Sequence, residues 1–416
     1  MRIAVIGSGI AGLAASYYLS RKHEVSLFDK DGRLGGHTNT ALVETGSGRT
    51  IPVDTGFIVH NDHTYPNLMK LLKELGVETQ PSDMSFSVTN RQSGFEYSSH
   101  GVNGFFAQRS NLFRPAHYLL LNEILRFNCT APQMLNHPKA AAMTIGDLID
   151  EGRYHSVFTE HYLYPMSAAV WSMSLDSIRS FPAFTLLRFF ENHGLLQLNN
   201  HFVWKVIRGG SNTYIPLLSA PFKDRIHTGV LVASVSRLET GVTLNFADRP
   251  AMAFDQVVLA CHGDQALPLL EKPTDAERDV MGSFKTSTNV ATLHTDRTLL
   301  PRRKRAWASW NYNLGMTAST AATVTYHMNR LQSLNDPLEY CVTLNGESAI
   351  DAAKVLRRIV YHHPLYTQEA VRAQGRWSEI SGQNRTHFCG AYWFYGFHED
   401  GLNSALRVAR ALSVEC

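Results

Sequence analysis

The sequence predicts an α/β fold in which one domain, built on a parallel sheet, is interleaved with a second, α+β domain. Three observations lead to this prediction. An apolar run at residues 3–6 fits a buried parallel strand, breaks at a glycine motif, and is followed by a helix-forming stretch. A second apolar strand, residues 24–28, follows that helix. No internal repeat or low-complexity linker divides the chain, so the two domains must share it in alternating segments.

The glycine motif is typical of a Rossmann-type dinucleotide-binding turn, because it lies between a strand and a helix. Gly7 permits the tight turn, Gly9 lets the backbone approach a diphosphate, and Gly12 lets the helix pack close to the strand. The diphosphate is then expected on the amide groups of Ile10 and Ala11 at the helix N-terminus, where the helix dipole favours negative charge. The motif therefore predicts a dinucleotide site.

An acid closes the second strand. Asp29 lies about 20 residues after Gly9, where the ribose 2′-hydroxyl of a dinucleotide is held. A carboxylate there disfavours a 2′-phosphate, so the sequence predicts FAD or NAD and not NADP. Lys30 follows directly and belongs to the same predicted contact region.

The next segment distinguishes between these two ligands. Arg33, Gly35 and Gly36 resemble the arginine–glycine–glycine signature of the amine-oxidase and phytoene-desaturase superfamily of flavoproteins. The resemblance implies FAD, with the glycines letting the backbone pass close to the flavin and its diphosphate. An arginine usually follows the glycine pair in that superfamily. This sequence has His37 instead, which implies a weaker contact with the phosphate.

Two further segments complete the flavin site that the resemblance implies. Residues 40–44 and 51–57 fit a hairpin around a turn at residues 46–48, and the resemblance implies that its second strand ends at Gly56 beside the flavin. A glycine-rich turn precedes a last helix, expected to begin at Asp400 or Gly401 and to end at Leu412. In the superfamily this helix directs its positive N-terminus at the pyrimidine end of the flavin. The cofactor contacts implied here are Thr55, Gly56, Phe57, Gly390, Glu399, Asp400, Gly401 and Ser404.

Several strings resemble one branch of this superfamily, the bacterial NAD/FAD-binding flavoproteins associated with cyclopropane fatty acid synthases. That branch includes the flavoprotein domain fused N-terminally to the plant synthases. The similarity covers essentially the whole chain and implies lipid acyl chemistry, with a functional link to a synthase-like methyltransferase. The strings lie at residues 64–67, 81–88, 164–172, 326–331 and 392–401.

The composition limits the remaining possibilities. The 416-residue chain is long enough for two domains, and its net charge of +3 is too small to indicate nucleic-acid binding. No window reaches 18 uninterrupted apolar residues, and the first strand starts at once, so neither a transmembrane helix nor a signal peptide is expected. Five scattered cysteines and 19 histidines show no metal-ligand spacing, so we expect no metal and a cytoplasmic protein with reduced thiols.

Two domains are expected from this pattern. The predicted FAD-binding domain takes residues 1–82, 200–265 and 376–416, and the predicted substrate-binding domain takes residues 83–199 and 266–375. The second domain is expected to contain strands at residues 290–294, 322–328 and 340–343, and helices at residues 115–128, 145–151, 155–162 and 182–193.

Residues of the predicted substrate-binding domain must determine the specificity, because FAD itself supplies the redox chemistry. Residues 162–171 and 181–198 are rich in aromatic and aliphatic side chains, and some of these must line the cavity. Amine oxidases of the superfamily usually place a lysine opposite the flavin, whereas the comparable strand here offers Asn289, with Lys285 out of phase. A long apolar cavity without that lysine suits an acyl chain better than an amine.

No catalytic acid or base is determined by the sequence. His398, Glu399 and Tyr395 are candidates because the resemblance implies that they lie near the flavin. His60 and His63 are candidates because they follow the hairpin. Glu399 is equally well explained as an acid at a helix N-terminus.

The basic run Arg302-Arg303-Lys304-Arg305 is the main charge cluster. It fits either an ordinary solvated loop or a contact with anionic lipid headgroups, since each basic residue near such a surface contributes about 1 kcal/mol. The second interpretation predicts peripheral binding at the inner membrane face.

Three functions stay open at this point. The first is an FAD-dependent oxidoreductase that oxidises, desaturates or isomerises a fatty-acyl chain, free or in phospholipid, by hydride transfer to flavin N5. The second is an oxidase of amines or amino acids. The third is a non-catalytic flavoprotein that supports a lipid methyltransferase.

Overall fold

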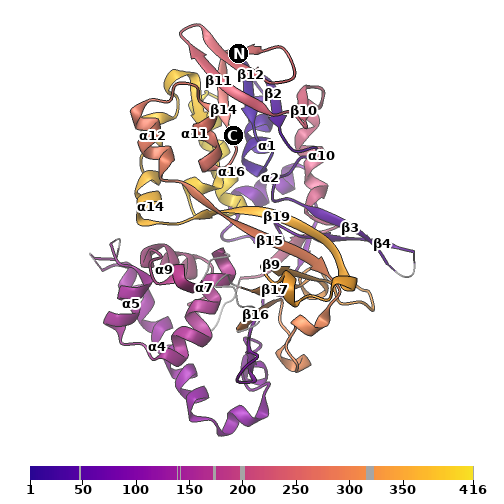
Figure 1. Ribbon diagram of the computed structural model, residues 1–416, viewed down its shortest axis with the longest axis vertical. Helices are drawn as coiled ribbons and strands as arrows, with labels where there is room; N and C mark the ends of the chain where they lie inside the picture. Colours follow the sequence, from indigo (N-terminus) through magenta and orange to yellow (C-terminus); the bar gives the residue numbers. More distant parts are fainter. Residues whose placement is uncertain are drawn as a thin grey trace.

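The computed structural model has an upper part, which holds both ends of the chain, and a lower, largely helical part (Figure 1). Two long strands run between these parts. The structure describes residues 1–45, 48–137, 139–140, 142–171, 175–196, 202–314 and 323–415.

The upper part is built on a five-stranded sheet of order β10-β2-β1-β14-β20, in which all pairs are parallel. Its strands come from three distant segments of the chain, which confirms the predicted α/β class. The boundaries of the two domains stay a prediction. The strands are β1 (Arg2–Ile6), β2 (Glu24–Asp29), β10 (Ile226–Thr228), β14 (Gln256–Leu259) and β20 (Thr386–Phe388).

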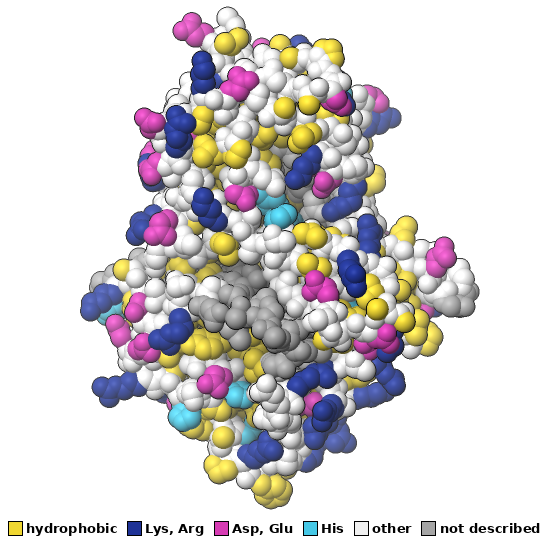
Figure 2. All heavy atoms as spheres, in the orientation of Figure 1, with side chains coloured by type: hydrophobic (Ala, Val, Ile, Leu, Met, Phe, Trp, Pro, Cys, Tyr) yellow, Lys and Arg dark blue, Asp and Glu magenta, His cyan; other side chains and the backbone are white. Residues whose placement is uncertain are grey.

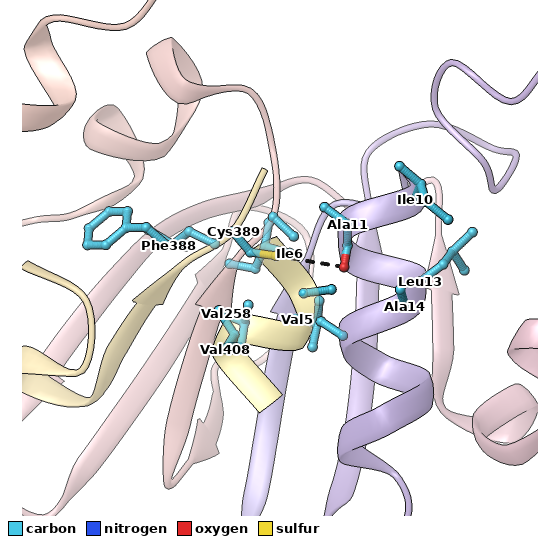
Figure 3. Packing of buried hydrophobic residues seen from close by; sticks show 14 of the residues in the cluster. Val5, Ile6, Ile10, Ala11, Leu13, Ala14, Val258, Phe388, Cys389 and Val408 are labelled. Atoms are coloured by element: carbon cyan, nitrogen blue, oxygen red, sulfur yellow. Dashed lines mark hydrogen bonds between the residues drawn. The ribbon is translucent and has the colours of Figure 1, made fainter. Parts of the chain in front are cut away.

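Buried apolar side chains join this sheet to its neighbours. Figure 3 shows Val5 of β1, Val258 of β14 and Val408 of the last helix, α16 (His398–Ala411), on one side of the first helix, α1 (Ile10–Leu19). The same cluster includes a small antiparallel sheet, β11-β12-β13, with strands β11 (Val232–Leu238), β12 (Gly241–Phe246) and β13 (Met252–Phe254).

The predicted hairpin is confirmed. β3 (Thr40–Glu44) pairs with β4 (Thr50–Asp54), and residues 46 and 47 of its turn lie outside the described residues. β4 ends at Asp54, before the expected end at Gly56. A three-stranded sheet of order β5-β9-β6 follows, made of β5 (Val59–Asn61), β9 (Trp204–Ile207) and β6 (Thr79–Pro81).

The lower part contains a seven-stranded sheet of order β19-β15-β18-β17-β16-β7-β8. Three of its strands were predicted, although residue 322 lies outside the described residues. The edge strand β19 was not predicted, because its first half is exposed and carries charges where a buried strand would be apolar. The strands are β7 (Phe86–Asn90), β8 (Phe95–Ser98), β15 (Lys285–His294), β16 (Trp310–Leu314), β17 (Val324–His327), β18 (Cys341–Leu344) and β19 (Val355–Leu365).

Helices complete both parts, and one is longer than its local signals predict. α4 (Pro115–Leu135) passes Pro132 because Ala131 and Leu135 are buried in the lower core. The others are α2 (Pro66–Glu74), α3 (Gly101–Phe105), α5 (Ile145–Gly152), α6 (Ser156–Phe158), α7 (Tyr164–Trp171), α8 (Leu175–Ile178), α9 (Ala183–Asn192), α10 (Tyr214–Ser219), α11 (Gly263–Leu269), α12 (Asp275–Gly282), α13 (Met328–Leu331), α14 (Gln368–Gln374) and α15 (Trp377–Ile380).

Candidate active site

The three motif glycines have different surroundings. A Cβ at Gly7, whose φ is +105°, would lie 2.7 Å from the carbonyl oxygen of Ala260. A Cβ at Gly12 would lie 1.8 Å from the carbonyl oxygen of Gly7. A Cβ at Gly9 would have no described atom within 4 Å. Gly7 and Gly12 are therefore required by packing, whereas Gly9 borders open space at the end of β1.

The N-terminus of α1 faces the same turn. Gly9 is its N-cap, and no side chain of the described residues caps it. The amide groups of the first turn, which include those of Ile10 and Ala11, are thus available to an anion. This is the arrangement that a diphosphate requires.

Asp29 holds the glycine turn from the end of β2. Its carboxylate accepts hydrogen bonds from the Ser8 amide at 2.7 Å and from the Ser8 hydroxyl, and its other oxygen accepts from the Asp31 amide at 2.9 Å. Lys30 beside it is exposed. The structure thus shows Asp29 organising the turn, and its contact with a ribose stays a prediction.

Arg33 shapes the second glycine loop. Its guanidinium donates to the carbonyl oxygens of Leu34, Gly36 and Thr38, at 3.3, 2.6 and 3.2 Å. This holds Gly36 so close that a Cβ there would lie 3.0 Å from the Cα of Gly9. Arg33 therefore acts on the cofactor position through the backbone of its own loop.

His37 connects that loop to the lower sheet. Its ring stacks on Tyr361 of β19, with centroids 4.8 Å apart, and lies 5.2 Å from His363. Its Nε2 is buried without a hydrogen-bond partner among the described residues. Burial and the neighbouring His363 and His262 lower the pKa of His37 well below its ordinary value. His37 is therefore neutral at pH 7 and presents an unpartnered nitrogen.

Tyr361 also ties the hairpin to β19. Its hydroxyl lies 3.1 Å from the Thr55 hydroxyl and accepts from the Asn39 amide at 3.0 Å. A Cβ at Gly56 would lie 2.1 Å from the carbonyl oxygen of His37. The predicted contacts Thr55, Gly56 and His37 therefore meet at one place.

Asn289 lies on β15 directly opposite Tyr361. Its amide nitrogen is 2.9 Å from Nδ1 of His363, and its oxygen accepts from Asn345 at 2.7 Å. Lys285 is exposed at the start of the strand. Burial lowers the pKa of His363 to about 4. The wall formed by Asn289 and His363 is therefore uncharged at pH 7.

The start of α16 borders the site next to the N-terminus of α1. Asp400 accepts a hydrogen bond from the Phe397 amide at 2.8 Å, so the helix begins at His398, earlier than the expected Asp400 or Gly401. A Cβ at Gly401 would lie 2.7 Å from Ile10, and Ser404 accepts from the Gly390 amide at 3.0 Å. The N-termini of α16 and α1 thus lie against each other.

His398 is held in an aromatic and polar cluster. Its ring stacks on Phe57 at a centroid distance of 3.6 Å, and its Nε2 lies 2.8 Å from the Thr38 hydroxyl and 3.2 Å from that of Tyr214. Burial lowers its pKa to about 3. His60 is also buried, and burial lowers its pKa to about 4. Both candidates are therefore neutral imidazoles.

Glu399 has a structural partner far along the chain. Its carboxylate accepts from the amides of Asn67 and Leu68, at 3.0 and 2.8 Å, and so caps the first turn of α2. Tyr395 and His63, with Asp400, line a nearby cavity of about 380 Å³. Burial raises the pKa of Asp400 to about 7. These positions assign no catalytic role, which stays a prediction for all five candidates.

The family model of flavin-containing amine oxidoreductases matches residues 10–330 of the chain. The chain belongs to this family. The sequence-based resemblance to the superfamily is confirmed at this level, and the narrower resemblance to the cyclopropane-synthase branch stays a prediction. No curated protein matches the sequence of this flavin-containing amine oxidoreductase.

Solved structures of other proteins share the fold of this flavin-containing amine oxidoreductase. A putrescine oxidase variant has a TM-score of 0.73 at 13% identity, covering 99% of both chains. Cyclohexylamine oxidase from Brevibacterium oxydans IH-35A has 0.69 at 15%, covering 99% of this chain and 98% of its own. A CLA-producing fatty acid isomerase from P. acnes has 0.70 at 14%, covering 98% of both.

The residues present in this flavin-containing amine oxidoreductase fit FAD, its cofactor. The open space at Gly9, the uncapped N-terminus of α1 and the unpartnered nitrogen of His37 are all compatible with the group. Bound FAD supplies the redox chemistry, and the protein supplies position and electrostatics. Among the described residues, no three His, Cys, Asp or Glu side chains are placed to hold a metal ion.

Two properties of this flavin-containing amine oxidoreductase bear on other sequence predictions. Cys389 points at α1 (Figure 3), its Sγ 3.8 Å from the carbonyl oxygen of Ala11, and burial raises its pKa to about 12, so it packs as a thiol. Among the described helices, none has the length and hydropathy needed to cross a membrane.

The sequence analysis did not identify Tyr361 or His363 as residues of the site. Both lie on β19, more than 300 residues from the residues near the hairpin that they meet: Tyr361 contacts Asn39 and Thr55, and His363 lies against His37. The only sequence signal was the histidine pair His362-His363 itself, which carries no spacing that indicates a cofactor wall.

Proposed function

We propose that this FAD-dependent oxidoreductase oxidises, desaturates or isomerises a fatty-acyl chain, free or in phospholipid. The observation that supports this proposal is that four described side chains around the predicted flavin position are uncharged at pH 7. His37, His363 and His398 have lowered pKa values, and Asn289 is an amide. A buried neutral wall cannot compensate an ammonium group but accepts an uncharged methylene chain.

Aromatic contacts lead from the lower core to this position. Phe189 of α9 stacks on Phe397 with centroids 5.1 Å apart, and Phe397 is followed by His398, which stacks on Phe57. Phe189 belongs to the large apolar cluster of the lower part. An acyl chain that enters from the helical part would therefore meet apolar side chains up to the flavin.

Oxidation of an amine is the second candidate. The cavity of about 380 Å³ beside the start of α16 is lined by Glu399 and Asp400, whose carboxylates suit a cation. Two of the structural neighbours are a putrescine oxidase and a cyclohexylamine oxidase. Against this candidate, Glu399 already caps α2, and burial raises the pKa of Asp400 to about 7, which reduces its charge.

The two candidates are separated by the compounds that reduce the bound flavin. Purified holoenzyme is mixed anaerobically with fatty acids and phospholipids of defined unsaturation, or with putrescine and cyclohexylamine. The lipid products are analysed by chromatography and mass spectrometry, because isomerisation leaves the flavin oxidised at the end. We expect conversion of a lipid and no bleaching by the amines.

A flavin-free variant, Gly9→Val, serves as the control, since lipid conversion by FAD chemistry must disappear with the flavin. Bleaching by amines alone would overturn the lipid proposal and support the second candidate. The functional link with a lipid methyltransferase stays a prediction of the sequence.

A further inference from the structure

We propose that the protein docks on an anionic membrane through one surface of its lower part, which we call the docking face. Apolar side chains at its tip enter the interfacial region, and basic side chains beside them meet lipid headgroups. The proposal concerns where the enzyme binds and does not depend on its substrate. The docking face consists of Val102, Arg109, Leu112, Phe113, Arg114, Tyr118, Arg302, Arg303, Lys304 and Arg305.

Four large apolar side chains are exposed within one short segment. Phe113 is 87% exposed and Val102 is 78% exposed, and Leu112 and Tyr118 are also exposed. Single exposed apolar residues are normal on a protein surface, whereas a group of them marks an interaction site. In the view of Figure 2, hydrophobic side chains gather at the lower tip of the molecule, with Lys and Arg side chains beside them.

Hydrogen bonds hold the elements of this tip together. The tip is formed by α3, the 3₁₀ helix η1 (Arg109–Phe113) and the start of α4. Arg109 donates to the carbonyl oxygen of Phe106 and to Asn103 at 2.6 Å, which joins η1 to α3. Tyr118 donates to the carbonyl oxygen of Leu112 at 2.9 Å, which joins α4 to η1. The exposed apolar side chains therefore belong to one continuous surface.

Glu96 brings the basic run to this tip. Its carboxylate, which is buried, accepts from the Arg302 amide at 2.8 Å and from the Arg303 guanidinium at 2.9 Å. Its backbone is bonded to the side chains of Gln108 and Asn111, at 3.1 and 3.3 Å. One buried residue thus fixes the basic run, which includes the 3₁₀ helix η6 (Lys304–Ala306), beside η1. The helix α3 packs against η6 as well.

The charge of the docking face has one sign. Residues 97–122 and 297–309 contain no Asp or Glu. Arg303 is neutralised by Glu96, which leaves five cations, contributed by Arg109, Arg114, Arg302, Lys304 and Arg305. Exposed aliphatic side chains have no partner on a nucleic acid but insert at the boundary of headgroups and acyl chains. Basic residues around them select anionic lipid.

Sedimentation with vesicles tests the proposal. The charge variant R302Q/K304Q/R305Q keeps Arg303, because that residue pairs with Glu96. The apolar variant is V102S/L112S/F113S. The matched control L231S/L238S removes exposed leucines of the upper part, at and near β11. Flavin content and thermal unfolding establish that each variant is folded.

We expect wild-type holoenzyme to pellet with vesicles that contain phosphatidylserine, and less so as salt rises from low to physiological concentration. The charge variant should lose at least about tenfold in partitioning to anionic vesicles, and the apolar variant should lose binding to anionic vesicles to a similar extent. The control should bind like wild type.

Three results would overturn the proposal. The first is no pelleting of wild type at low salt, and the second is an equal loss in the control. The third is binding to single-stranded nucleic acid or to an acidic protein with none to vesicles. The wild-type measurement can refute the proposal by itself, even if one of the variants fails to fold.

Discussion

Replacing Gly9 by valine should remove FAD and leave the folded apoprotein intact. Gly9 has φ −65° and ψ 179°, a backbone conformation open to any L-residue, and no described atom lies within 4 Å of a Cβ built there. The free energy of unfolding of the apoprotein should therefore change by no more than about 0.5 kcal/mol. In the holoprotein, the same side chain would occupy the space of the diphosphate at the N-terminus of α1.

In the presence of FAD, the Gly9→Val variant should be much less stable than the wild type. We expect the affinity for FAD to fall at least about a hundredfold, which is ~2.7 kcal/mol. Because FAD binds the folded protein and not the unfolded chain, a lower affinity for FAD reduces the stability that bound FAD provides. At free FAD about a hundred times the wild-type Kd, the wild type gains ~2.7 kcal/mol, and the variant gains well under 1 kcal/mol.

Gly12→Ala is the matched control, because its Cβ would lie 1.8 Å from the carbonyl oxygen of Gly7. Neither the start of α1 nor the turn at Gly7 can move away. The free energy of unfolding of this variant should therefore fall by about 3 kcal/mol or more, with or without FAD. The assays are the flavin-to-protein ratio after denaturing release, and urea unfolding with and without added FAD. A Gly9→Val protein with full flavin content would refute the proposed position of the diphosphate. A Gly9→Val protein that is as unstable as Gly12→Ala in the absence of FAD would refute the conclusion that Gly9 borders open space.

Three further predictions follow from the structure. Arg33→Ala should lower FAD affinity by about tenfold, ~1.4 kcal/mol, because its loop loses three hydrogen bonds to carbonyl oxygens; an unchanged flavin titration would contradict this. Arg237→Met should destabilise the protein by about 3–5 kcal/mol, because it leaves the carboxylate of the buried Glu277 without its ion pair; adding Glu277→Gln, which removes the charge but keeps an acceptor for the Thr274 amide, should recover most of the loss in urea unfolding. Acid should also destabilise the protein. Burial lowers the pKa of His60 and His363 to about 4 and that of His398 to about 3, so their contribution is complete above pH 6.5 and is lost as pH falls through those values. His60 alone accounts for up to ~3 kcal/mol. Burial raises the pKa of Asp54 to about 6 and that of Asp400 to about 7, so these two groups destabilise the protein as pH rises. The three buried histidines outweigh them because they are more numerous. Greater stability to urea at about pH 4.5 than at about pH 7.5 would contradict the prediction.

Local signals determined the parts of the site that lie close together in the sequence. The glycine turn, the acid at Asp29 and the hairpin each depend on residues within one strand and its turn, so their patterns are readable without tertiary contacts. The α/β class followed from these elements, and FAD followed from the family resemblance of Arg33, Gly35 and Gly36; both are confirmed.

Contacts between distant segments decided the rest. Glu399 looked like an acid of its own helix, but it caps α2, because the fold brings the amides of Asn67 and Leu68 within hydrogen-bond distance. Arg303 looked like one of four equivalent cations, but Glu96 neutralises it.

The wall formed by Asn289 and His363, together with Tyr361 and His37 beside it, combines a loop from the start of the chain with two strands of the lower sheet. Sequence alone predicted which residues bind a dinucleotide, because that prediction depends on short-range backbone geometry. Only the tertiary structure decided which side chains are buried together, and therefore which of them are uncharged. Burial and the spacing of neighbouring groups depend on how distant segments pack.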